Sequence, residues 1–179
     1  MPADSDFDPQ RILETLDRHH VEYVIVGGFG SQIHGAHRQT YDLDLVPNSS
    51  GENSERLATA LRELNARLRV AGMTDEEARQ LPVVLDAATI QAFGSTTWTT
   101  DAGPLDVLQT LPVAGGSREY YQLDDRAVGV TLSGIAVRVA ALEDIIASKT
   151  HADRPKDREA LAELHELRRS ERHGSDDES

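Results

Sequence analysis

The segment from Val26 to Pro47, VGGFGSQIHGAHRQTYDLDLVP, constrains the fold of this chain more than any other segment. The β-branched run EYVIV leads directly into Gly27 and Gly28, which indicates a strand that ends in a glycine turn. The following FGSQIHGA is typical of a short helix or turn, and TYDLDLVP of a second strand. In that second strand Asp42 and Asp44 would share one face, because alternate residues of a strand point the same way.

Two carboxylates held this close repel each other, and their pKa values rise unless a cation lies between them. Mg²⁺ binds through one or two carboxylates and completes its coordination with water and substrate phosphates. Asp42 and Asp44 are therefore candidate metal ligands. The alternative is an exposed strand face with solvated aspartates, although aspartate is disfavoured in strands and needs a reason to occur there twice.

The glycine pair is compatible with a phosphate site. Gly27 and Gly28 would let the backbone approach a phosphate closely and present its N–H groups, and Ser31 could add a hydroxyl. The alternative is a strand-to-helix turn without a ligand. The segment matches neither the P-loop pattern GxxxxGK[ST] nor the dinucleotide pattern GxGxxG.

A third acid is available in the run GPLDVLQTL, where Leu105 and Val107 would face the core and Asp106 the opposite side. On a strand next to that of Asp42 and Asp44, Asp106 could complete a carboxylate triad that holds two metal ions. Three further aspartates compete for this position but sit beside loop signals: Asp86, Asp101 and Asp124.

The rest of the chain alternates helical and strand patterns, which indicates an α/β protein. We expect helices at residues 9–20, 55–70, 141–151 and 155–172, strands at TTWTT and PLDVLQTL, a hairpin at GVTLSGIAVRV, and a short helix that begins at the capping box of Thr74 and Glu77. No internal repeat or long linker divides the chain. Residues 1–172 are therefore predicted to form one domain, helical from about residue 141, followed by a disordered acidic tail at residues 173–179.

Composition excludes several classes of protein. The chain has 179 residues, no cysteine and a formal net charge of −13, so we expect no disulfide or thiolate metal site and no sequence-independent binding of duplex DNA. A local basic groove for one nucleic-acid end remains possible. We expect no signal peptide, because the start MPADSDFDPQ is acidic, and no membrane span, because no apolar run is long enough. These features predict a cytoplasmic protein.

Three motifs in order carry a resemblance to a known superfamily: Gly27–Gly28, the run RQTYDLDL that begins at Arg38, and the segment KTHADRPKD that begins at Lys149. Together they resemble the nucleotidyltransferase fold shared with DNA polymerase β, and more closely the small bacterial toxins of the AbiEii and MenT type. The resemblance extends over most of the chain, from about Val24 to Leu164. It implies a mixed sheet flanked by helices.

The resemblance also implies roles for individual residues. Asp42, Asp44 and Asp106 would bind Mg²⁺. The triphosphate of an NTP would contact Gly27, Gly28, Ser31 and Arg154, and Lys149 would offset the charge of the triphosphate. Arg38 and Thr40 would line the opening of this site. Asp157 would either touch the active site or brace the start of a helix through Arg154 or Lys156. Two positions differ from related proteins. The second glycine, Gly28, replaces the usual serine, and Ala160 stands where related toxins often have a further acid.

The implied reaction is transfer of a nucleoside monophosphate from an NTP to an acceptor hydroxyl, with release of pyrophosphate. The acceptor that the resemblance favours is the 3′ end of tRNA, which would make the protein a toxin with a cognate antitoxin. That antitoxin would cover the site or phosphorylate Thr40 or Ser31. The alternatives are nucleotidylation of a protein or an antibiotic-like small molecule, and an inactive partner-binding module.

Overall fold

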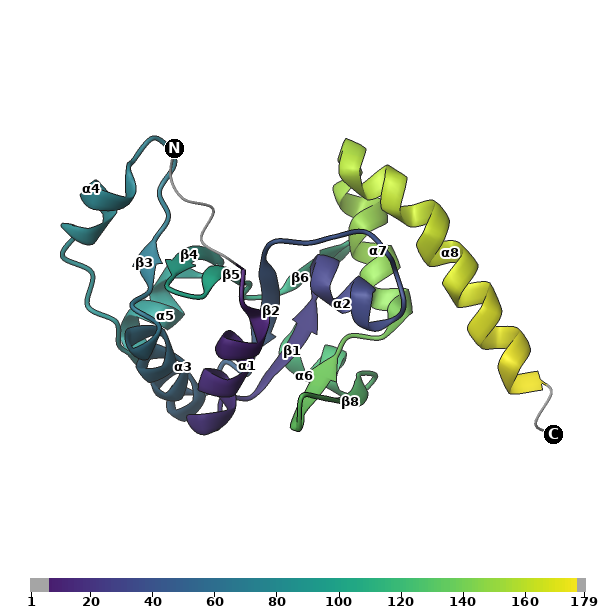
Figure 1. The fold of residues 1–179 in the computed structure, drawn as a ribbon, viewed down its shortest axis with the longest axis horizontal. Helices are drawn as coiled ribbons and strands as arrows, with labels where there is room; N and C mark the ends of the chain where they lie inside the picture. Colours follow the sequence, from purple (N-terminus) through teal and green to yellow (C-terminus); the bar gives the residue numbers. More distant parts are fainter. Residues whose placement is uncertain (1–6, 177–179) are drawn as a thin grey trace.

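A seven-stranded sheet organises the molecule, and its strands follow the order β3-β4-β5-β2-β1-β9-β8 (Figure 1). The computed structural model describes residues 7–176. Strand β1 is antiparallel to β2 and parallel to β9, whereas β2 is parallel to β5, so the sheet is mixed. Strands β6 and β7 form a separate hairpin. The strands are β1 (Tyr23–Val26), β2 (Leu43–Pro47), β3 (Arg67–Leu68), β4 (Thr96–Thr100), β5 (Gly103–Val107), β6 (Leu111–Val113), β7 (Gly116–Arg118), β8 (Val128–Leu132) and β9 (Ile135–Val139).

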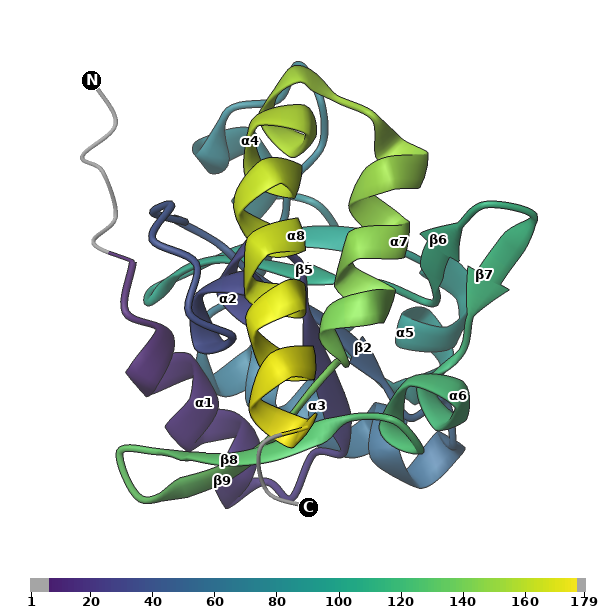
Figure 2. The same ribbon diagram turned by 90° about the vertical axis from the view of Figure 1, so that its right-hand side faces the viewer.

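Helices cover both faces of this sheet. Figure 1 shows α1 and α3 on one side and α7 and α8 on the other, and Figure 2 shows α7 and α8 side by side. The helices are α1 (Pro9–Arg18), α2 (Gly27–Ile33), α3 (Gly51–Glu63), α4 (Asp75–Arg79), α5 (Ala87–Phe93), α6 (Tyr120–Asp124), α7 (Leu142–Ala152) and α8 (Pro155–Asp176). None of these helices has the length and hydropathy that crossing a membrane requires.

The alternation along β1 separates two hydrophobic cores. Tyr23 and Ile25 pack into a core that α1 and α3 cover, together with Leu43 and Leu45 of β2. Val24 and Val26 face a second core, built with residues of α7 and α8 such as Leu142, Ile145 and Leu164. Because alternate residues of a strand face opposite sides, Asp44, between Leu43 and Leu45, faces the side of α7 and α8.

The predicted helix at residues 55–70 was wrong at both ends. Helix α3 begins at Gly51, where the Ser50 side chain accepts a hydrogen bond from the Asn53 backbone, and it ends at Glu63. Asn65 then adopts a left-handed conformation with φ 50°. Leu68, which fits the helical spacing, instead lies in β3 opposite Trp98 of β4. The capping box of Thr74 and Glu77 is confirmed at the start of α4.

The C-terminal helices follow the prediction more closely. Helix α7 ends at Ala152, and Asp153 in a left-handed conformation redirects the chain into α8 at Pro155. Helix α8 continues to Asp176, so residues 173–176 are helical where a disordered tail was predicted. Residues 177–179 of that predicted tail lie outside the described residues.

Candidate active site

Strands β2 and β5 bring two aspartates into direct opposition. In their parallel register Asp44 lies opposite Asp106, with Leu43 opposite Leu105 on the other face. The alternation predicted that Asp42 lies in the strand, but Asp42 lies in the bend just before β2. Carboxylate oxygens of Asp42, Asp44 and Asp106 nevertheless all lie within 4.8 Å of one another. The sequence-predicted triad is therefore a single cluster of carboxylates.

Burial and the neighbouring carboxylates make Asp44 harder to ionise than an ordinary aspartate. Burial, then the charges of Asp42 and Asp106, raise the pKa of Asp44 to about 7, although the nearby charge of Lys149 acts in the opposite direction. The Oδ1 atom of Asp106 is buried and has no hydrogen-bond partner. A buried acceptor without a donor calls for a cation or water. Three oxygen donors of this kind fit a hard divalent cation such as Mg²⁺.

The two glycines make room for side chains of the acidic motif. Gly27 has φ 67°, and a Cβ atom at this position would lie 2.7 Å from the Cγ of Asp44. A Cβ at Gly28 would lie 2.9 Å from the Oγ1 of Thr40, which donates a 2.7 Å hydrogen bond to the Oδ1 of Asp42. The usual serine at position 28 would therefore collide with Thr40. The glycine pair therefore lets α2 begin next to Asp44 and Thr40.

Ser31 lies in α2 and is buried. Its hydroxyl donates a 3.0 Å hydrogen bond to the carbonyl oxygen of Gly27, one turn earlier in the helix. The predicted contact of this hydroxyl with a triphosphate stays a prediction, and it would require the hydroxyl to exchange its present partner.

The junction of α7 and α8 supplies the positive charge. Asp157 is fully buried and accepts hydrogen bonds from the backbone N–H and, at 2.6 Å, from the Nε of Arg154. The Nζ of Lys149 lies 3.7 Å from the Oδ1 of Asp157. Burial lowers the pKa of Lys149, whereas the charges of Asp157 and Asp44 act to raise it. Asp157 thus braces the start of α8 and at the same time holds Lys149, whose charge acts on Asp44.

Arg38 lies in the loop between α2 and β2 and contacts α8. Its guanidinium forms a 2.7 Å ion pair with Glu159, and His37 in the same loop pairs with Glu163 at 2.7 Å. Arg38 was predicted to line the opening of the site, but the ion pairs of this loop with Glu159 and Glu163 of α8 were not predicted. No local pattern could reveal these pairs, because more than 120 residues separate each partner from the other.

The three competing aspartates are occupied elsewhere. Asp86 caps α5 by accepting a hydrogen bond from the Thr89 backbone. Asp101 pairs with Arg67 at 3.3 Å, and Asp124 pairs with Arg138 at 2.8 Å. The choice of Asp106 over these residues is therefore supported by geometry.

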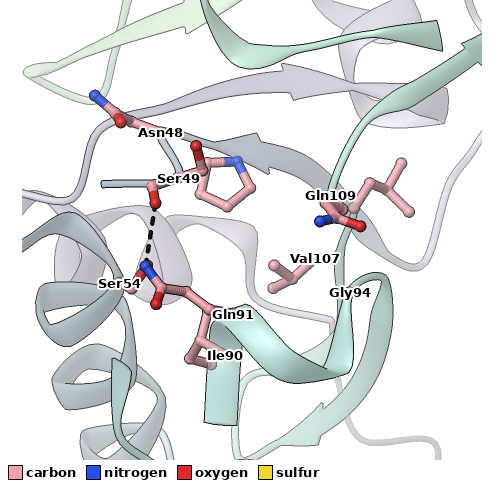
Figure 3. A pocket seen from close by; sticks show the side chains of 10 residues that line it. Asn48, Ser49, Ser54, Ile90, Gln91, Gly94, Val107 and Gln109 are labelled. Carbon is pink, nitrogen blue, oxygen red and sulfur yellow. Dashed lines mark hydrogen bonds between the residues drawn. The ribbon is translucent and has the colours of Figure 1, made fainter. Parts of the chain in front are cut away.

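A pocket of about 150 Å³ (Figure 3) is lined by Val107, which faces the core of α1 and α3 on the side of the sheet opposite to Asp106. Its lining combines apolar residues such as Ile90 and Val107 with the amides of Gln91 and Gln109. The Gln91 amide donates a 3.3 Å hydrogen bond to the Ser49 carbonyl across the pocket mouth. None of the lining residues is charged, and none belongs to the carboxylate cluster.

The mixed sheet, with carboxylates on adjacent strands β2 and β5, is the fold of the nucleotidyltransferases, and several solved structures share it. A lincomycin-bound lincosamide antibiotic adenylyltransferase, LnuA, has a TM-score of 0.57 at 15% identity, over 87% of this chain and 93% of that chain. The antibiotic-resistance factor ANT(2″)-Ia, in complex with adenylyl-2″-tobramycin, has a TM-score of 0.53 at 17% identity, over 93% and 96% of the two chains. A nucleotidyltransferase-type protein from Thermotoga maritima has a TM-score of 0.52 at 13% identity, over 88% and 90%.

The chain belongs to the family described as nucleotidyl transferase AbiEii toxin, type IV toxin–antitoxin system, whose model matches residues 11–165. It is therefore a nucleotidyltransferase, as the three sequence motifs predicted. No curated protein matches its sequence.

Proposed function

We propose that this protein is a Mg²⁺-dependent toxin that transfers a nucleoside monophosphate from an NTP to the 3′ end of tRNA and thereby blocks translation. The observation that carries the proposal is the cluster of Asp42, Asp44 and Asp106 within 4.8 Å, with the cation of Lys149 close enough to act on the pKa of Asp44. Nucleotidyl transfer depends mainly on positioning and charge stabilisation, and this site offers both.

The residues of the site divide into metal ligands, cations for the triphosphate, and residues that position these groups. Asp42, Asp44 and Asp106 hold the metal, and Thr40 orients Asp42 through its hydroxyl. Lys149 and Arg154 offset the charge of the triphosphate, and Asp157 positions both cations from a fully buried site. Bound Mg²⁺ would supply charge neutralisation at the phosphates and activation of the acceptor hydroxyl. The backbone at Gly27 leaves Asp44 the space to reach this position.

Three features support an RNA acceptor over a small molecule. The family name describes a toxin, and a toxin needs a cellular target. Arg154 and Arg38, both near the loop and helix that flank the acids, keep 58% and 46% of their side chains exposed, as the rim of an RNA site requires. The pocket in Figure 3 is lined by none of the three acids, so it offers no acceptor site beside them.

The test is to incubate the protein with Mg²⁺, total bacterial RNA and each of the four α-labelled NTPs in turn. We expect label in tRNA-sized RNA with the wild type and none with Asp44→Asn. The variant Asp124→Asn, which makes the same change outside the cluster, should label RNA normally. Label found only in protein, or loss of label with Asp124→Asn, would contradict the proposal.

A second candidate is nucleotidylation of a small molecule, which the names of the structural neighbours favour, since LnuA and ANT(2″)-Ia carry antibiotics in their descriptions. The same reaction without RNA, supplied with an aminoglycoside or a lincosamide, separates the two candidates. Label transferred to the antibiotic would replace the RNA proposal. An inactive partner-binding module would transfer no label to any acceptor, and the complete set of three acids argues against it.

The antitoxin that the family name implies could act by phosphorylation. We propose Thr40 as the target rather than Ser31, because Ser31 is buried and bonded within α2, whereas Thr40 lies in the loop. A phosphate on Thr40 would repel both Asp42 and an incoming triphosphate. Mass spectrometry of the toxin co-expressed with its antitoxin should detect the modified peptide; finding only unmodified peptides would refute the idea.

A further inference from the structure

Strand β8 leaves one edge of the large sheet open. It is the last strand in the sheet order, and within residues 7–176 no strand pairs with its outer side. The β8–β9 hairpin lies along the bottom of the molecule in Figure 2, and Figure 1 shows α8 further to the right than β8. The opposite edge strand, β3, has only two residues and contacts α4. The only long open edge in the described chain is therefore that of β8.

The hairpin register identifies which backbone groups face outward. Leu132 pairs with Ile135 across the two-residue turn of Ser133 and Gly134, whose φ values are 49° and 83°. In such a primed turn the closing pair exchanges both hydrogen bonds, and the bonded pairs then alternate along the ladder. Leu132, Val130 and Val128 thus point their N–H and C=O groups toward β9. Gly129 and Thr131 point theirs outward.

This edge lacks the features that normally prevent strand addition. Natural edge strands are protected by charged side chains, proline, bulges or shortness. Residues 127–137 contain no charged residue and no proline, and β8 pairs regularly with β9 over all five of its residues. The charge beside the strand is that of Arg138, which lies opposite Gly129 and forms a 2.8 Å ion pair with Asp124. Val128 is 45% exposed, and Val130 and Leu132 pack only partly against the core of α1 and α3. The edge is apolar, neutral and long enough to pair.

We propose that two copies of the chain pair through β8, antiparallel and symmetric about Val130. The outward groups of Gly129 would bond those of Thr131 of the partner subunit, and the reverse pair would follow by symmetry. Val128 would then lie beside Leu132 of the partner subunit, so that the exposed apolar ends of the two strands cover each other. A two-fold interface requires such self-complementarity.

A second copy fits this edge better than a charged partner does. The strand itself offers matched donors and acceptors and no charged side chain, and Arg138 beside it is already paired with Asp124. The net charge of −13 opposes association of two copies over longer distances, and salt screens this repulsion. The dimer should therefore tighten as ionic strength rises. The interface would leave the carboxylates free, because β1 and β9 separate β8 from β2 and β5.

Single cysteines test the register, and the chain offers a clean background because it has no cysteine of its own. At the symmetry axis the two copies of position 130 would form a non-bonded pair with Cα atoms about 4.5 Å apart, within disulfide range. The two copies of position 128 would be about 13 Å apart, from the rise of a strand. Mild oxidation should cross-link Val130→Cys into a disulfide-bonded dimer and leave Val128→Cys without a cross-link. Equal cross-linking of both variants, or none of Val130→Cys, would overturn the proposal.

Mass measurement in solution provides the second test. Light scattering should give twice the monomer mass of 19.6 kDa for the wild type, with a larger dimer fraction at higher salt. Thr131→Pro removes an outward N–H and should give a monomer, since an edge strand tolerates proline where its N–H faces solvent. Circular dichroism checks that this variant is folded, and if it is not, Thr131→Lys replaces it. A wild type that stays monomeric at every concentration and salt, or a folded variant that stays dimeric, would overturn the proposal.

Discussion

The carboxylate of Asp44 fills the space that a side chain at Gly27 would need. This relationship links the glycine motif to the acidic motif. The first residue of α2, Gly27, must lack a Cβ because the Asp44 side chain occupies that space. The positive φ of Gly27 adds a second reason, since the left-handed region is unfavourable for other residues.

Gly27→Ala should destabilise the protein and abolish nucleotidyl transfer. Backbone strain and the collision with Asp44 together should cost about 2–5 kcal/mol in the free energy of unfolding. Gly115→Ala is a matched control, because Gly115 also has a positive φ of 78° but nothing within 4 Å of an added Cβ. It should cost only the strain, about 1–2 kcal/mol. Urea unfolding measures both values, and equal losses would show that the collision is absent.

Asp44 should make the metal-free protein less stable as the pH rises. Its folded pKa of about 7 exceeds the ordinary value of 3.8, so between these values the folded state binds more protons than the unfolded state. The free energy of unfolding should fall from about pH 4 to about pH 7 by at most on the order of 4 kcal/mol, at 1.36 kcal/mol per unit. Urea unfolding in a chelator measures this slope. Asp44→Asn should flatten it, and an unchanged slope in the variant would assign it to other groups.

Addition of Mg²⁺ should raise the melting temperature, since a ligand that binds only the folded state stabilises it. Chelation should return the melting temperature to that of the metal-free protein. Asp106→Asn should weaken Mg²⁺ binding at least about tenfold, because it removes one of three carboxylate donors. Asp124→Asn, which alters an acid paired with Arg138, should keep the wild-type response. Thermal unfolding followed by fluorescence separates these outcomes, and identical responses of both variants would remove Asp106 from the site.

Lys149→Gln should lower kcat/KM for the NTP by about 100-fold, a typical effect of removing one transition-state charge partner. Lys156→Gln is the matched control, since Lys156 is the only other lysine in the sequence and is exposed. Lys156→Gln should change kcat/KM by no more than about threefold. Steady-state labelling of RNA at varied NTP measures both, and a comparable loss in the two variants would indicate a general charge effect.

Asp157→Asn should destabilise the junction of α7 and α8 by about 1–3 kcal/mol, because it weakens hydrogen bonds to a buried acceptor and leaves Lys149 without its partner. Although burial acts to raise it, the pKa of Asp157 is lowered by its bonds from Arg154 and by the charges of Arg154 and Lys149. Its contribution to stability is therefore complete above about pH 4 and declines as the pH falls through the folded pKa.

Urea unfolding at neutral and at acidic pH tests this expectation for Asp157. Asp153→Asn alters an exposed ion pair with Arg158 and should cost less than about 1 kcal/mol. A similar loss in the two variants would show that the burial of Asp157 is unimportant.

Sequence alternation was sufficient to select Asp106, because its apolar neighbours Leu105 and Val107 predicted the face it occupies. The pairing of β2 with β5 could not be derived in the same way. It joins Asp44 and Asp106 across a long crossover, and register between distant strands has no local signal. The site was therefore predicted as a set of candidate residues, and the structure supplied the proximity of its three acids.

Local sequence patterns gave wrong predictions where tertiary contacts determine the secondary structure. Leu68 continues the helical spacing of α3, yet it pairs with Trp98 in the sheet. Asp86 was considered as a rival acid, whereas it caps α5, a helix that was not predicted. The β6–β7 hairpin and α6, whose short segments carry little periodicity, were also not predicted.

The strand order also determines when this enzyme can first work during its synthesis. Strand β1 leaves the ribosome early, but its neighbour β9 is among the last strands made, and Lys149 follows it. Until then Val24 and Val26 have no second core to enter, and the acids have no cation beside them. A nascent or prematurely terminated chain that ends before α7 therefore lacks a complete site. We therefore expect no nucleotidyl transfer from partial copies of the chain.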